Sequence, residues 1–126
     1  MIRGGDTTVR VVNRTREILL GDKVRTTGTF LSRLVGLLGT TAIAVGEGLW
    51  IVPCRSVHTL GMRYPIDVVF HDARGVVVGI LEGVPPNRVG RVFRGARGAL
   101  ELPSGILSAT GTVPGDRLEF EGGGAA

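Results

Sequence analysis

The chain has 126 residues, enough for one domain that buries its own core without disulfide or metal cross-links. Hydrophobic residues make up 43% of it, which argues against wholesale disorder, and its single cysteine excludes an internal disulfide. The net charge of +4 permits contact with nucleic acid or an anionic membrane but does not by itself indicate either.

Sequence features also bear on compartment and cofactors. The N-terminal stretch MIRGGDTTVRVV lacks the apolar core of a signal peptide, and no cysteine pair exists to use an oxidising compartment. The most apolar run, FLSRLVGLLGTTAIAV, is interrupted by Arg33 and is too short to span a bilayer. Neither CxxC nor a phosphate-loop motif is present. We therefore expect a cytoplasmic protein with no membrane span and no cofactor.

The first 53 residues predict two strands, a helix and a third strand. Alternation in TTVRVVN (7–13) predicts a strand, and EILL (17–20) is its expected hairpin partner. Apolar residues recur at helical spacing in GTFLSRLVGLLG (28–39). EGLWIVP (47–53) then reads as a short buried strand.

The second half of the chain predicts four more strands. Two β-branched runs, 65–71 and 76–84, are joined by DARG, which suits a hairpin turn. ALELP (99–103) predicts another strand, and SGILSATG (104–111) predicts one helical turn. The turn VPGD precedes the last strand, which ends near residue 121.

These elements together predict the fold class. About seven short strands and one short helix favour a mostly β (α+β), compact, β-barrel-like fold. We find no internal repeat or domain boundary, so residues 1–121 are expected to form a single domain. The Gly/Ala tail, 122–126, is expected to be disordered.

Cys54 and His58 lie in the segment CRSVHTLGMRYPIDVVF and would share one face of an extended chain. A thiolate and an imidazole so placed could bind Zn²⁺ or act as nucleophile and base. The chain has only one Cys and two His, so a metal site would have to recruit His71 and a carboxylate such as Asp67. The simpler interpretation, which we favour, makes Cys54 a buried small apolar residue.

Two carboxylates stand out within apolar strand patterns. Asp67 interrupts PIDVVF, and either lies on a solvated face, caps backbone amides of a neighbouring loop, or pairs with Arg55 or Arg63. A functional interpretation makes it an acid, base or ligand at a pocket rim, and we favour the structural one. Glu101, between two leucines in ALELP, allows the same alternatives.

Four arginines recur every third residue after PPN. Arg88, Arg91, Arg94 and Arg97 would align along a polyproline II segment, which Pro85 and Pro86 could begin. With Phe93 beside them they could grip phosphates or stack on a base. The alternative, which we favour, is a solvated Arg-rich loop.

The segments HTLGMRYPIDVVF, GALELPSG and PGDRL, together with the helical RLVGLLG, strongly resemble the domain of unknown function 192 family. The resemblance covers about residues 33–118 and implies a small, mostly β, barrel-like domain with a short helix. It implies no reaction. The residues that coincide with the family's motif positions are His58, Thr59, Gly61, Met62, Pro65, Asp67, Leu100, Glu101 and Gly105.

We therefore expect a non-catalytic binding domain for a small molecule, peptide or protein. Its candidate pocket comprises His58, Thr59, Met62, Asp67 and Glu101. One alternative is a metal-assisted or thiol-dependent hydrolase that uses Cys54, His58 and Asp67. The second alternative is binding of anions or nucleic acid through the four arginines, which predicts affinity that falls steeply with salt.

Overall fold

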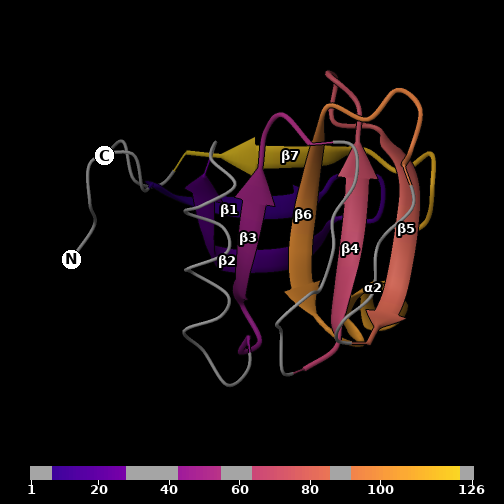
Figure 1. Ribbon diagram of the computed structural model, residues 1–126. Coiled ribbons are helices and arrows are strands. Elements are labelled where there is room, and N and C mark those ends of the chain that lie inside the picture. Colours follow the sequence, from indigo (N-terminus) through magenta and orange to yellow (C-terminus); the bar gives the residue numbers. More distant parts are fainter. Residues whose placement is uncertain (1–6, 28–42, 55–63, 86–91, 123–126) are drawn as a thin grey trace.

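A computed structural model describes residues 7–27, 43–54, 64–85 and 92–122, which hold seven strands and a short helix (Figure 1). The strands are β1 (Thr7–Asn13), β2 (Ile18–Thr27), β3 (Glu47–Ile51), β4 (Ile66–His71), β5 (Val77–Val84), β6 (Gly98–Pro103) and β7 (Leu118–Glu121). The helix, α2 (Ile106–Thr110), forms where one helical turn was predicted. The helix predicted over 28–39 lies outside the described residues.

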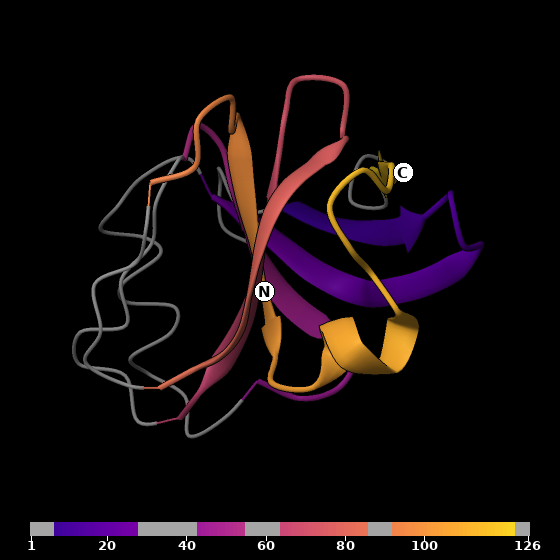
Figure 2. The same cartoon turned by 90° about the vertical axis from the view of Figure 1, so that its right-hand side faces the viewer.

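The strands form one curved sheet in the order β5-β4-β6-β3-β2-β1-β7. All neighbouring strands are antiparallel except β2 and β3, which are parallel. The edge strands approach each other where Val76 bridges Arg117 and the Leu118 amide donates to the Gly75 carbonyl at 2.8 Å. The sheet is thus a half-barrel (Figure 2), which confirms the predicted mostly β fold of about seven strands.

Side-chain alternation divides the buried residues between the two faces of the sheet. The outer core comprises Leu49, Ile51, Tyr64, Ile66, Val68, Phe70, Ala96 and Ala99. The inner core, on the concave face, comprises Val9, Val11, Leu20, Val24, Val69, Val77, Leu100, Leu102, Leu107 and Leu118. β4 is buried on both faces, which explains its nearly continuous apolar sequence.

The helix α2 lies at one end of the half-barrel, beside the start of β4 (Figure 1). Asp67 fixes it there: its Oδ2 accepts the amides of Gly105 at 3.0 Å and Leu107 at 2.9 Å. Its Oδ1 accepts the amide of Gly83 at 2.8 Å, at the end of β5. The side chain is completely buried. One buried carboxylate thus accepts hydrogen bonds from three backbone amides, at the start of α2 and near the end of β5, that have no partner within those elements.

A buried polar cluster joins the β1–β2 turn to the turn before β7. Asn13 donates through Nδ2 to Asp116 at 2.9 Å and to Thr112 at 3.1 Å, and Arg16 donates to the same Asp116 oxygen at 2.6 Å. Burial raises the pKa of Asp116, but the hydrogen bonds from Arg16, Asn13 and Val113 outweigh it and leave the pKa below its usual value. The predicted VPGD turn therefore also holds the β1–β2 turn against the chain that enters β7.

Candidate functional site

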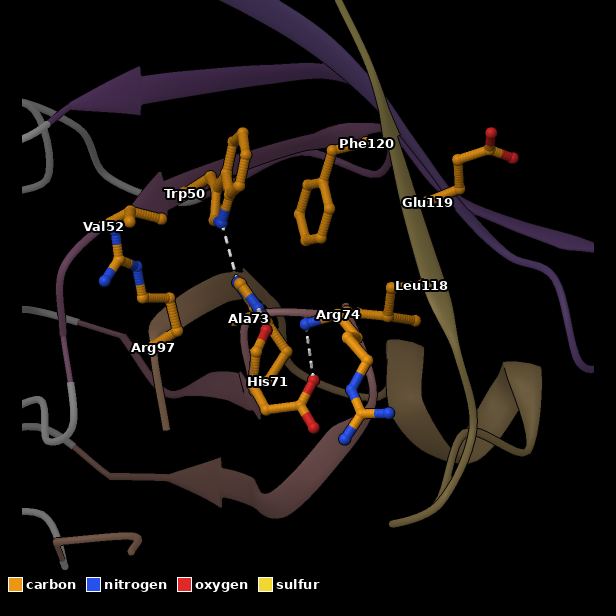
Figure 3. Close-up of a pocket in the computed structure, with 11 residues that line it drawn as sticks. Trp50, Val52, His71, Ala73, Arg74, Arg97, Leu118, Glu119 and Phe120 are labelled. Atoms are coloured by element: carbon orange, nitrogen blue, oxygen red, sulfur yellow. Dashed lines mark hydrogen bonds between the residues drawn. The ribbon is translucent and has the colours of Figure 1, made fainter. Parts of the chain in front are cut away.

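A groove of about 600 Å³ opens where β4 ends (Figure 3). This is the end of the half-barrel opposite α2, as the ribbon in Figure 1 shows. We call this cavity the mouth groove. Its lining comes from β3, β4, β7, the β4–β5 turn and the segment before β6. The described residues that line it are Trp50, Val52, His71, Asp72, Ala73, Arg74, Gly75, Arg97, Leu118, Glu119 and Phe120. A cavity of this size holds a small organic molecule, and such sites commonly occupy barrel mouths.

Three rings form the apolar wall of the mouth groove. Trp50 and Phe120 stack with centroids 4.0 Å apart and planes 13° from parallel. His71 tilts against both, with centroids 5.0 Å from Phe120 and 6.0 Å from Trp50. Alternation explains this meeting. His71 lies two residues after inner-core Val69, and Phe120 lies two residues after inner-core Leu118. Trp50 lies between two outer-core residues of β3 and therefore also faces inward.

His71 is held as a neutral ring in a defined tautomer. Trp50 donates its indole N–H to Nε2 of His71 at 2.9 Å, so this nitrogen is an acceptor. Nδ1 lies 2.8 Å from the carbonyl oxygen of Asp72 and therefore carries the proton. Burial lowers the pKa of His71, and the Asp72 carbonyl and carboxylate offset this only in part.

We expect the His71 ring to titrate below its ordinary pKa of 6.5 and to make stability depend on pH. Below about pH 6.5 the unfolded chain protonates this residue while the folded ring stays neutral, so the unfolded state binds more protons. Stability is thus complete above that pH and falls as the pH drops toward the folded pKa, by at most about 1.4 kcal/mol per pH unit. Histidine NMR titration and urea unfolding between pH 7.5 and 5 measure both effects.

His71→Gln is the control for this pH dependence, because its amide oxygen still accepts the Trp50 indole but does not titrate. Its unfolding free energy should vary less between pH 7.5 and 5 than that of the wild type. Equal slopes in the two proteins would contradict the prediction.

The charged side chains that line the mouth groove differ in their hydrogen-bond and ion-pair partners. Asp72 accepts the amides of Arg74 at 2.8 Å and Val76 at 2.9 Å, which shapes the predicted DARG turn. Glu119 pairs with Arg14, and its carboxylate points away from the three rings (Figure 3). Arg74 and Arg97 are exposed, and neither forms an ion pair with any residue in the described ranges.

The structure separates two members of the predicted pocket. Asp67 lies on the inner face, whereas Glu101 pairs in register with Leu49 and Val68 of the outer core and shares their face. Both side chains are completely buried. One pocket therefore does not contain both carboxylates, and the idea that Asp67 lies on a solvated face is wrong. His58, Thr59 and Met62 lie outside the described residues.

The residues of the predicted hydrolase likewise lie apart. Cys54 packs partly buried against the outer core, in keeping with its interpretation as a small apolar residue. Asp67 is on the opposite face and engaged with three amides, so the two do not converge. His58 lies outside the described residues. Within the described ranges, no three His, Cys, Asp or Glu side chains gather as a metal site would require.

The arginine series is only partly within the described residues, because Arg88 and Arg91 fall outside them. Between Arg94 and Arg97 the chain turns: the Ala96 amide donates to the Phe93 carbonyl at 3.2 Å, and Gly95 has φ +83°. A polyproline II segment does not continue through this turn, so that part of the prediction is wrong. Arg97 reaches the mouth groove, whereas Arg94 does not line it.

No sequence motif pointed to Trp50, Phe120 or Arg74, and His71 entered only as an additional ligand for a possible metal site. Trp50 and Phe120 are 70 positions apart, on strands that meet only through the curvature of the sheet. The sequence held one modest indication of this site. Three rings lie near the ends of predicted strands, on the inner face, in a chain with only 5% aromatic residues.

The fold and groove define a small, mostly β domain with one end of its half-barrel occupied by a helix and an aromatic groove at the other. The domain of unknown function 192 model, described as "Uncharacterized ACR", matches residues 11–120. The chain belongs to this family, as its motifs predicted. No curated protein matches significantly.

Two solved structures share the fold. One, described as a "putative transcription regulator" from Sinorhizobium meliloti 1021, has a TM-score of 0.76 and 24% identity, over 91% of this chain and 93% of its own. The other, a protein of unknown function from Novosphingobium aromaticivorans DSM 12444, has a TM-score of 0.75 and 20% identity, over 90% and 84%. At such identities the likeness shows the fold alone. Among the described residues, no helix is long and apolar enough to cross a membrane.

Proposed function

We propose that this protein is a non-catalytic binding domain and that a small molecule occupies the mouth groove. The observation that carries this proposal is the cavity of about 600 Å³ with three aromatic rings along one wall. The half-buried rings of Trp50 and Phe120 supply apolar surface whose burial by a ligand is favourable. The single cysteine, not used in a disulfide, supports a cytoplasmic setting.

The chemistry of the lining favours binding over catalysis. Of the described residues that line the groove, none carries a hydroxyl or thiol that could act as a nucleophile. His71, the obvious base, has both ring nitrogens engaged. Asp72 supports its own turn. The groove therefore offers shape and apolar contact but few groups poised to move a proton.

The mouth groove replaces the five-residue pocket as our proposed site because Asp67 and Glu101 face opposite ways. The mouth groove is still close in sequence to the motif of the predicted pocket, because His71 ends the strand that begins at PID. Nucleic-acid binding by the whole arginine series has less support, because the turn after Arg94 breaks its alignment.

Binding is testable through Trp50, because this is the chain's only tryptophan and gives a single indole N–H signal. A panel of small aromatic and aliphatic compounds, added to ¹⁵N-labelled protein, should include compounds that shift this signal together with those of His71 and Phe120. Phe120→Leu should weaken such binding about fivefold, because roughly 1 kcal/mol of apolar contact is lost.

Val92→Ser is the matched control, because Val92 is 67% exposed and does not line the groove. It should leave binding unchanged. The proposal is wrong if no compound shifts the indole signal, or if the compounds that bind shift signals elsewhere and ignore Phe120→Leu.

A further inference from the structure

We infer that the ligand of the mouth groove is an aromatic anion: a planar apolar ring that carries a carboxylate or a similar acidic group. This inference rests on the proposed function and specifies its ligand class. It follows from which hydrogen-bond donors and charged groups around the three rings already have partners within the protein and which remain for a ligand.

The uncharged donors of the wall are not available to a ligand. The Trp50 indole N–H is donated to His71, and the His71 Nδ1 proton is donated to the Asp72 carbonyl. The remaining side-chain donors in the described lining are the guanidinium groups of Arg74 and Arg97. A polar group that enters the groove therefore meets charged donors, which bind carboxylates more strongly than neutral acceptors.

The acidic residues of the lining offset these two cations only in part. Glu119 follows buried Leu118 and precedes inner-facing Phe120, so alternation directs its carboxylate outward, to Arg14. Asp72 keeps its negative charge, because two turn amides donate to its Oδ1 and lower its pKa, and this charge partly offsets that of nearby Arg74. Arg97 forms no ion pair with any described residue. Figure 3 shows Arg97 and Arg74 on opposite sides of His71. The groove thus presents Arg97 as a cation with no ion pair among the described residues, and Arg74 as a second cation that Asp72 partly offsets.

Four probe compounds distinguish the contribution of the ligand's aromatic ring from the contribution of its negative charge. We would titrate the full chain with 2-naphthoate, its neutral amide 2-naphthamide, the cation 2-naphthylmethylammonium and the non-aromatic cyclohexanecarboxylate, following the Trp50 indole signal. We expect 2-naphthoate to bind about tenfold more tightly than 2-naphthamide, as one charge-assisted contact implies. The cation and the non-aromatic acid should bind more weakly still.

The chain offers a matched control for the charge. Arg97→Ala and Arg74→Ala, singly and together, should reduce 2-naphthoate affinity while leaving 2-naphthamide affinity unchanged. Arg94→Ala removes another exposed arginine, three positions before Arg97, that does not line the groove, and it should change the affinity for neither compound. These side chains are exposed, so the variants should keep the wild-type thermal midpoint.

The outcomes distinguish the ligand class from the proposed function. If 2-naphthamide or 2-naphthylmethylammonium binds as tightly as 2-naphthoate, the groove binds ligands but the anionic class is wrong. If cyclohexanecarboxylate matches 2-naphthoate, the aromatic part of the inference is wrong. If no probe moves the indole signal, both the ligand class and the proposed binding site are overturned.

Discussion

Replacement of Asp67 by alanine is expected to lower the free energy of unfolding by about 3–5 kcal/mol. The variant removes one completely buried carboxylate and leaves the amides of Gly83, Gly105 and Leu107 without their acceptor. A buried amide that loses its partner costs roughly 1–3 kcal/mol, which applies in full to Leu107. The amides of Gly83 and Gly105 are only partly buried, so water can replace part of what they lose. Urea unfolding, followed by circular dichroism, measures the change.

Two further variants make the Asp67 result specific. Asp67→Asn keeps the size but replaces one acceptor oxygen with a donor, so it should lose about 2 kcal/mol or more. Glu82→Ala removes an exposed acid near the same end of the sheet and should stay within about 0.5 kcal/mol of wild type. A loss below about 1 kcal/mol for Asp67→Ala would contradict the anchoring role.

Asp67 also shows where prediction from sequence stops. The apolar pattern around it predicts a buried strand, and amide capping was among the roles considered. The sequence could not choose that role, because the three amides belong to residues 16, 38 and 40 positions further along the chain. Only the sheet order places these residues beside the start of β4.

Strands were predictable because their signal is local, whereas the mouth groove depends on curvature. Alternation and turn residues located all seven strands, including the hairpin around DARG, although β2 continues to Thr27, well beyond the predicted 17–20. Nothing in this local pattern indicates that β7 lies beside β1, with Phe120 stacked on Trp50. A site built from the ends of three strands therefore requires the three-dimensional fold.

Substitution of Gly75 by alanine should be the most damaging change at the mouth groove, costing about 3 kcal/mol or more. Gly75 has φ +85°, which alone costs an alanine roughly 1 kcal/mol. A Cβ at this position would also overlap the carbonyl oxygen of Leu118, a backbone atom that cannot rotate away. The β4–β5 turn and β7 would have to separate, with loss of the bond from the Leu118 amide.

Gly95→Ala isolates that overlap, because Gly95 has nearly the same backbone angle, φ +83°, but nothing within 4 Å of its Cβ position. It should cost only the conformational penalty of about 1 kcal/mol. The difference between the two variants in urea unfolding therefore measures the contact between the turn and β7. Equal losses would show that backbone conformation alone accounts for both.

The Gly75 variant links stability to the groove, because displacement of β7 also moves Phe120 away from Trp50. The Trp50 indole signal should therefore shift in Gly75→Ala and stay in place in Gly95→Ala. Affinity for 2-naphthoate should fall only in the first variant. An unmoved indole signal in a destabilised Gly75→Ala protein would mean that the turn supports the sheet without shaping the groove.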